Sequence, residues 1–293
     1  MILNSTQLKD LSELAIEAAL LAGKLIQACD HKALTHHFKS GASSKASEVF
    51  TELDLKAQEV IINHLKPSLC QFDLALLAEE TCDDRKRFEK DYLWCIDPLD
   101  GTLPFIEGVH GYAVSIALVK KDGTPQIGVI YDPLKNDLYH AVKGLGLYKN
   151  REAWSPSDSS KENIFYFICD RSFYENEFFA QYQAFIQKMS EEMGCQKVEL
   201  IRHGGGAMNA MWTLSSPFAC YFKLPKKKLG GGSLWDFSAS ACLFHEANKP
   251  ATNIHGDKLD LNRPDSTFMN HQGVLYSSNK EISLAIQDFY ASL

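Results

Sequence analysis

The chain has 293 residues, of which 45% are hydrophobic, so it is long and apolar enough for a sizeable globular core. Its formal net charge of −7 leaves no basic excess for binding a phosphate backbone, which argues against a nucleic-acid partner. No apolar run reaches the length of about 18 residues that a membrane span needs, and the first residues lack the pattern of a secretory signal, so neither membrane nor secretion is expected.

The first predicted element is an amphipathic helix that follows the polar residues NST at positions 4–6. Leucine and alanine recur on one helix face, at positions 8, 11, 14, 15, 18, 21, 22 and 25. A second helix is predicted from Glu52 to Leu65, closed by Pro67, with Asp54 in its first turn beside the apolar stripe. The chain is thus expected to begin with two long helices.

Short strands are predicted from about residue 72. The segments LALLA, YLWCID, AVSIALVKKDGTPQIGVIYDP and DLYHAVKG have the composition of strands, and the third holds two strands joined by a turn at KDGTP. We therefore expect an antiparallel sheet. The polar stretch 149–161 then predicts a boundary, which divides the chain into halves at 1–152 and 153–293.

The second half begins with the strand-like NIFYFIC, followed by a helix predicted over 175–193 and then by interleaved helices and strands. Two helices, a sheet of hairpins and a mixed second half indicate an α+β fold built in layers. Eight cysteines are scattered without a C-x-x-C pair, and several lie in apolar runs. This pattern favours reduced, buried thiols in a cytoplasmic protein over a disulfide framework or a zinc site.

The segment WCIDPLDGTLPF, 94–105, carries the strongest chemical signal. Asp97 is expected at the end of a strand, and Pro98 stiffens the turn that leads to Asp100. At about 4 Å and an effective dielectric near 20, two such carboxylates repel each other by roughly 4 kcal/mol. A bound cation is therefore expected here, although an Asx-type turn would explain a single aspartate equally well.

Gly101 and Thr102 follow this acidic pair. Glycine lets the backbone come close to a ligand, and the N–H groups of both residues would face outward if a short helix begins there. The sequence thus predicts an anion site beside the cation site. A phosphate and a metal would then share one pocket.

Three other segments supply carboxylates. Glu79 and Glu80 end the strand-like LLAEE, Asp236 lies at the start of a helix-like run behind Trp235, and Asp54 opens the second helix. Each is ordinary by itself, as an exposed acidic pair or a helix cap. Together they offer only oxygen ligands, without histidine or cysteine, which suits Mg²⁺.

The pattern D…EE…DPxDGT…WDxxxA, formed by these segments, resembles the inositol monophosphatase superfamily of Mg²⁺-dependent, lithium-sensitive phosphatases. The match runs from the first helix to about 256–262. The resemblance implies a layered αβαβα sandwich, a small phosphorylated metabolite as substrate, two or three Mg²⁺ per active site, inhibition by Li⁺ and a homodimer. The spacing of Asp97 and Asp100 excludes the haloacid-dehalogenase class, whose D-x-D-x-T motif places one residue, not two, between the aspartates.

By the same resemblance, the metal ligands can be assigned. Glu79, Asp97 and the backbone carbonyl of Leu99 would hold the first metal. Asp97, Asp100 and Asp236 would hold the second. One metal would generate hydroxide from water near neutral pH, and the other would stabilise the leaving oxygen.

The resemblance also implies the roles of the residues that face the substrate. Thr102, with Asp54 and Glu79, would position and deprotonate the attacking water. Gly101 and Thr102 would bind the phosphate through their N–H groups, with Asp100 beside them. No covalent intermediate with the enzyme is needed.

The substrate side is predicted from IRHGGGAMNAM, 201–211, which would place Gly205 and Ala207 next to the leaving alcohol. Inositol monophosphatases typically carry a glutamate shortly before the Trp-Asp pair, and this chain has Lys223 at the matching position. A longer loop with the lysines of 226–228 follows. A cationic rim of this kind would favour a substrate with a second phosphate.

These features resemble the 3′(2′),5′-bisphosphate nucleotidase branch, which converts 3′-phosphoadenosine 5′-phosphate to AMP and phosphate. An inositol or related sugar phosphate remains the alternative substrate. The lysines of 226–228 would be a solvated loop without contact to the ligand in that case. A third possibility is an inactive scaffold on the same fold.

Overall fold

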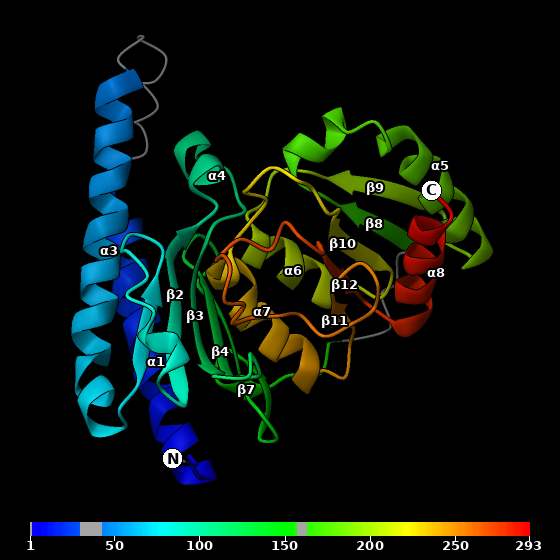
Figure 1. Cartoon of the computed structure of the whole chain (residues 1–293). Coiled ribbons are helices and arrows are strands. Elements are labelled where there is room, and N and C mark those ends of the chain that lie inside the picture. Colours follow the sequence, from blue (N-terminus) through cyan, green and yellow to red (C-terminus); the bar gives the residue numbers. More distant parts are fainter. Residues whose placement is uncertain (1, 30–42, 157–162) are drawn as a thin grey trace.

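The computed structural model describes residues 2–29, 43–156 and 163–293, without the side chains of residues 43–51. Within these residues, the predicted layered α+β fold is confirmed. Figure 1 shows two helices, a sheet, a middle layer of helices, a second sheet and an outer layer of helices. Three separate apolar cores lie between these five layers. Among the described residues, no helix has the length and the apolar character to span a bilayer.

The outer N-terminal layer consists of α1 (Ser5–Gln27) and α3 (Ser43–Gln71), which pack against each other and against the first sheet. The predicted cap of α1 is confirmed, because the Asn4 side chain accepts a hydrogen bond from the backbone N–H of Gln7 at 3.0 Å. The Gln7 side chain accepts one in return from the N–H of Asn4. This reciprocal pair satisfies two N–H groups that the helix itself leaves free.

The prediction that Pro67 closes the second helix is wrong, because α3 continues to Gln71 with the proline inside it. Pro67 and Asn63, whose carbonyl loses its helical partner, are both exposed, so water can satisfy that carbonyl. The last turn is fixed by Ser68, which is buried and accepts a hydrogen bond from Nε1 of Trp94 at 2.9 Å. Tertiary contacts thus outweigh the helix-breaking effect of the proline.

The first sheet contains seven strands in chain order, and the predicted turn at KDGTP joins the third to the fourth. The strands are β1 (Ala75–Ala78), β2 (Tyr92–Asp100), β3 (Ala113–Lys120), β4 (Pro125–Asp132), β5 (Asp137–Val142), β6 (Gly146–Lys149) and β7 (Glu152–Ala153). The predicted antiparallel sheet is confirmed from β2 to β7, but β1 runs parallel to β2. Their carboxyl ends therefore lie together, and the N–H of Glu79 donates to the Ile96 carbonyl, one residue before Asp97.

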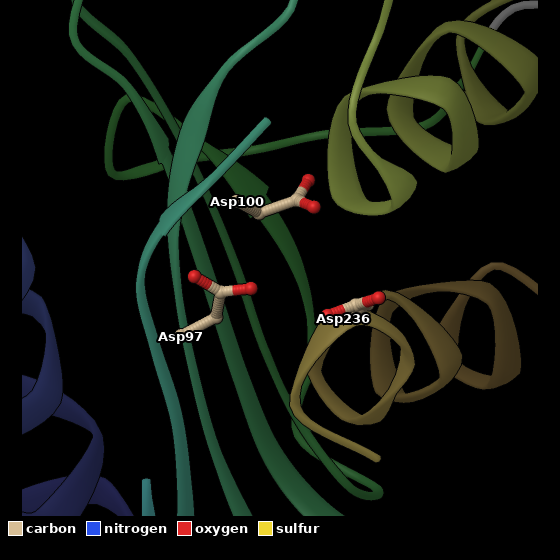
Figure 2. Close-up of side chains that lie close together, drawn as sticks. All are labelled: Asp97, Asp100 and Asp236. Carbon is tan, nitrogen blue, oxygen red and sulfur yellow. The ribbon is translucent and has the colours of Figure 1, made fainter. Parts of the chain in front are cut away.

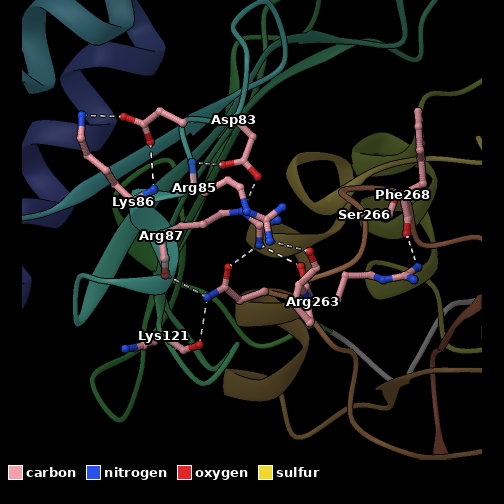
Figure 3. A network of polar contacts seen from close by, with 11 residues as sticks. Asp83, Arg85, Lys86, Arg87, Lys121, Arg263, Ser266 and Phe268 are labelled. Atoms are coloured by element: carbon pink, nitrogen blue, oxygen red, sulfur yellow. Dashed lines mark hydrogen bonds and ion pairs between the residues drawn. The ribbon is translucent and has the colours of Figure 1, made fainter.

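A buried arginine fixes the segment that returns the chain from β1 to β2 (Figure 3). Arg87, in the short 3₁₀ helix η1 (Lys86–Phe88), is 1% exposed and donates to Asp83 at 2.8 Å and to the Asn262 side chain at 2.7 Å. Asn262 in turn donates to the carbonyls of Arg87 and Lys121. The network thus joins the segment between β1 and β2, and the end of β3, to Asn262 in the C-terminal part of the chain.

The second sheet has the order β11-β12-β10-β8-β9. Its strands are β8 (Ile164–Ile168), β9 (Lys197–Ile201), β10 (Ala219–Lys223), β11 (Ala251–Thr252) and β12 (Val274–Ser277). The helices α5 (Phe179–Glu192) and α8 (Lys280–Ala291) contribute to the core on its outer side. The helix predicted over 175–193 therefore begins later, because residues Arg171–Glu175 form a separate 3₁₀ helix, η2.

The middle layer consists of α6 (Gly206–Leu214) and α7 (Leu234–Glu246), which lie between the two sheets. Helix α7 comes from the second half of the chain but packs against β3 and β4 of the first sheet. A Cβ atom at Gly128 in β4 would lie 2.4 Å from the carbonyl of Ala239, so glycine permits this close contact. The division of the chain near residue 152 stays a prediction.

Candidate active site

Three aspartates converge where β2 and α7 approach each other. Asp97, Asp100 and Asp236 each offer a carboxylate oxygen, and these oxygens all lie within 4.8 Å of one another. Figure 2 shows the three side chains, two from the end of β2 and one from the first turn of α7, around a common space. Asp236 thus joins two aspartates that lie 136 or more positions earlier in the sequence.

An irregularity in β2 brings its two aspartates to the same side. In a regular strand, residues three positions apart point to opposite faces of the sheet. The pairing of β2 with β3 shifts between Asp97, opposite Ser115, and Asp100, opposite Ala113. This bulge lets both carboxylates face α7, and Pro98, which cannot donate to a ladder, lies within it.

The first turn of α6 fixes the carboxylate of Asp100. The N–H of Gly206 donates to Oδ1 at 3.0 Å, and the N–H of Ala207 donates to Oδ2 at 2.7 Å. Gly205 donates its N–H to the Gly111 carbonyl at 2.7 Å, so this group is already bonded. Ala207 is fully buried and its N–H positions Asp100, while its contact with the leaving alcohol stays a prediction.

Asp236 and Leu99 are also held by local hydrogen bonds. The backbone N–H of Ser233 donates to Oδ2 of Asp236 at 3.0 Å, in a capping box at the start of α7. The Thr102 hydroxyl donates to the carbonyl of Leu99 at 3.4 Å. Gly101, at φ +85°, precedes the short helix α4 (Thr102–Glu107), as the sequence predicts. These contacts fix the backbone on which the acidic cluster is built.

Glu79 and Asp54 complete the acidic region. Glu79 follows β1 and shares a hydrogen bond with the carboxyl group of Asp97. Asp54 in α3 is 8% exposed, and its Oδ1 has no hydrogen-bond partner within the described structure. The negative charges of Glu80 and Glu79 raise the pKa of Asp54, so the three carboxyl groups lie close enough to interact.

Lys223 and backbone N–H groups compensate the negative charge of the cluster only in part, and the pKa values of its carboxyl groups are raised. Burial, and then the neighbouring carboxylates, raise the pKa of Asp97 and Asp100 well above the ordinary value. Burial, followed by the charges of Glu80 and Glu79, raises the pKa of Asp54 from 3.8 to about 7. Such a set of oxygen donors, with an unpartnered buried Asp54 oxygen, fits a hard divalent cation such as Mg²⁺.

These pKa shifts predict how stability depends on pH. The raised pKa of Asp54 means that the folded chain keeps a proton that the unfolded chain loses between about pH 4 and pH 7. The metal-free protein should therefore lose stability as pH rises through this range. Mg²⁺ binds the deprotonated carboxylates, so it should raise the Tm more at about pH 8 than at about pH 5.

Thermal unfolding in EDTA and in excess Mg²⁺, at several pH values from about 5 to about 8, measures this effect. Ca²⁺ and Na⁺ at matched ionic strength serve as controls for general screening. If Mg²⁺ raised the Tm equally at every pH, the carboxyl groups with raised pKa values would not be the groups that bind the metal.

A cavity of about 340 Å³ opens beside the cluster and is lined by Asp100, Gly101, Thr102, Gly205 and Asp236, among other residues. Lys223 also lines it, and its Nζ lies 2.6 Å from Oδ2 of Asp170. Asp170 was not among the residues predicted from the sequence. It follows the strand NIFYFIC at its carboxyl end, in the same way as Glu79 follows β1, so the pattern could have indicated it.

The layered fold and the acidic cavity define a phosphatase of the class that uses divalent metal ions. A family model described as the inositol monophosphatase family matches residues 7–291. The chain therefore belongs to the inositol monophosphatase family, whose members are generally Mg²⁺-dependent.

Relatives with curated names cover most of the chain. Nus factor SuhB of Escherichia coli (strain K12) is 28% identical over 244 residues, 83% of this chain and 85% of its own length. Inositol-1-monophosphatase of Bacillus subtilis (strain 168) is 24% identical over 290 residues, 97% of this chain and 98% of its own length.

Solved structures of similar fold include inositol monophosphatase-II from Staphylococcus aureus MSSA476, with a TM-score of 0.69 and 20% identity over 96% of this chain and 95% of that chain. The similar structures also include SaIMPase-II with inositol monophosphate bound, at a TM-score of 0.68, and with 2′AMP bound, at 0.69. At sequence identities of 19–20%, the similarity to these structures shows the fold alone.

Proposed function

We propose that the protein hydrolyses a small phosphate monoester with the help of Mg²⁺ held by the acidic cluster. The observation that carries this proposal is the convergence of Asp97, Asp100 and Asp236 within 4.8 Å, with Asp100 and Asp236 in the wall of a cavity. With Glu79 and the Leu99 carbonyl, these aspartates would hold two or three ions. When bound, Mg²⁺ supplies Lewis-acid chemistry that activates water and stabilises the leaving oxygen.

The residues of the chain itself orient the reactants. The Thr102 hydroxyl, next to the Leu99 carbonyl, positions the attacking water, and the unpartnered Oδ1 of Asp54 lies in the same acidic region to accept its proton together with Glu79. The N–H groups of Gly101 and Thr102 bind the phosphate oxygens. The water attacks phosphorus directly, so the leaving alcohol departs without a covalent enzyme intermediate.

The substrate that fits the cavity best is the monophosphate of an uncharged polyol, such as inositol 1-phosphate. The preference for a bisphosphate nucleotide depends on Lys223 and the lysines of 226–228 as free cations, and Lys223 is ion-paired with Asp170 in the fold. The nucleotide remains a second candidate because Lys226 lines an adjoining cavity of about 180 Å³, which shares Asp170 and Lys223 with the catalytic one. Similar structures hold inositol monophosphate or 2′AMP, so both classes suit this fold.

Release of inorganic phosphate tests this proposal. We expect Mg²⁺-dependent hydrolysis of inositol 1-phosphate and p-nitrophenyl phosphate, with no release in EDTA, and slower hydrolysis of 3′-phosphoadenosine 5′-phosphate. Faster release from the bisphosphate would favour the second candidate. No release from any of the three substrates would favour an inactive scaffold.

Several predictions of the sequence analysis accompany this proposal. Li⁺ should inhibit by competing at the metal site, and the chain should act as a cytoplasmic homodimer without a nucleic-acid partner. The net charge of −7 supports the last point, although one relative bears the name Nus factor. Retention on RNA at physiological salt would contradict it.

A further inference from the structure

Two neighbouring parallel strands of the second sheet end in an ion pair at the catalytic cavity. Strand β10 ends at Lys223, and Asp170 lies two residues beyond the end of β8, its parallel partner. Nζ of Lys223 lies 2.6 Å from Oδ2 of Asp170, and the two side chains are 16% and 24% exposed. Both residues line the same cavity as Asp100 and Asp236.

Both partners of this ion pair are fixed by further contacts. The hydroxyl group of Tyr221, a fully buried residue on β10, donates to Oδ1 of Asp170 at 3.2 Å. Nζ of Lys223 lies 5.5 Å from the centroid of the Phe237 ring, within the range of a cation–π contact. Each oxygen of Asp170 therefore has one partner, and these contacts hold the ion pair in place in the cavity wall.

The remaining carboxylates around Lys223 have other partners in the proposed reaction. Asp100 and Asp236 are proposed ligands of Mg²⁺, which would balance their charge, and Asp100 also accepts two backbone N–H groups. Asp170 is the carboxylate in contact with Lys223 that lies outside the proposed metal-ligand set. It is thus the residue that neutralises the lysine when the metals are bound.

The other basic residues that line the cavity within the described chain offer no free cation either. Arg171 donates two N–H groups to the carboxylate of Glu107, one of them at 2.6 Å. His203 has a pKa below its ordinary value because of burial and then the nearby His110 and Arg171, so it is neutral at pH 7. The cavity therefore presents paired charges and polar groups to the part of the substrate that leaves.

We infer that Asp170 determines specificity by cancelling the charge of Lys223, so that the cavity accepts an uncharged, hydroxyl-bearing leaving group and disfavours one with a second phosphate. This inference rests on the proposed function. Lys223 can donate a remaining N–H to one hydroxyl of the leaving group, and Asp170 can accept from its neighbour. Lys226 lines the adjoining cavity and not this one, so a second phosphate here would find no unpaired cation in the lining and would face the Asp170 carboxylate.

The test uses two substrates that differ only in the second phosphate, adenosine 3′-phosphate and 3′-phosphoadenosine 5′-phosphate. Formation of adenosine and of AMP is measured by chromatography, and the ratio of the two kcat/KM values reports the preference for the second phosphate. Asp170→Asn, which keeps the shape of the side chain, should raise this ratio at least about tenfold. Lys223→Gln should move it in the opposite direction.

A double-mutant cycle with Asp170→Asn and Lys223→Gln makes the test specific to this ion pair. The double variant should return the ratio to within about threefold of the wild-type value, because neither charge remains. Asp137→Asn, which breaks a lysine–aspartate pair of 2.9 Å with Lys149 elsewhere on the surface, is the matched control and should leave the ratio unchanged.

The outcomes separate this inference from the proposed function. Mg²⁺-dependent hydrolysis by the wild type, with a ratio that Asp170→Asn and Lys223→Gln do not move, overturns the inference alone. If the wild type releases no phosphate from these nucleotides, from inositol 1-phosphate or from p-nitrophenyl phosphate, the proposed function falls and the inference falls with it.

Discussion

Asp97→Asn is expected to lower kcat by at least about 10³-fold while leaving the fold intact. Asp97 is the carboxylate that the assignment shares between two metal ions, and asparagine has the same shape but no charge to bind them. The fold should survive because Asp97 is buried among carboxylates that raise its pKa, so the metal-free protein gains nothing from its negative charge. The Tm in EDTA should be unchanged or higher.

Steady-state kinetics with inositol 1-phosphate and Mg²⁺ titration calorimetry measure the two effects of this substitution. Asp265→Asn, at a side chain that is 82% exposed, is the matched control and should retain wild-type kinetics. A rate near that of the wild type for Asp97→Asn would show that the chemistry takes place elsewhere on the molecule.

Gly205→Ala is expected to lower kcat by about 10²-fold, although it adds a single methyl group outside the metal-ligand set. A Cβ atom at this position would lie 2.5 Å from Oδ2 of Asp100, well inside van der Waals contact. The Asp100 carboxylate would have to move, and it would lose the N–H groups of Gly206 and Ala207 that orient it. A misplaced ligand should weaken Mg²⁺ binding and catalysis together.

The control for this substitution is Gly194→Ala. Gly194 has φ +77°, so alanine is strained there, but a Cβ atom would have no neighbour within 4 Å. The Gly194 variant should lose stability and keep its kcat, whereas the Gly205 variant should lose kcat and require more Mg²⁺ for half-maximal rate. Equal kcat values for Gly205→Ala and the wild type would mean that Asp100 tolerates displacement.

Much of the fold follows from local pattern. The cap of α1 at Asn4, the turn between β3 and β4 and most of the apolar face of α1 agree with the sequence, because each depends on residues close together in the chain; Leu21 of the predicted face is exposed. The parallel pairing of β1 with β2 and the continuation of α3 past Pro67 do not follow from local pattern, since both are decided by tertiary contacts. The layered α+β class can be predicted from the sequence, but the parallel direction of β1 at one edge of the first sheet cannot.

The same distinction applies to the site. The carboxylates of Asp97, Asp100 and Asp236 could be selected from the sequence because each ends or begins an apolar element. The bulge that turns Asp97 and Asp100 to one side could not, because it depends on the register between β2 and β3. The pairing of Lys223 with Asp170, 53 positions earlier, depends on two strands that become neighbours only in the folded sheet.

The acidic cluster as a metal site is tested most directly by anomalous diffraction from crystals soaked in Mn²⁺, which binds oxygen ligands as Mg²⁺ does. We predict a strong anomalous peak coordinated by Asp97, Asp100 and Asp236, and a second one between Asp97 and Glu79. A structure with Mn²⁺ present and no ion within coordinating distance of Asp97 would contradict the account.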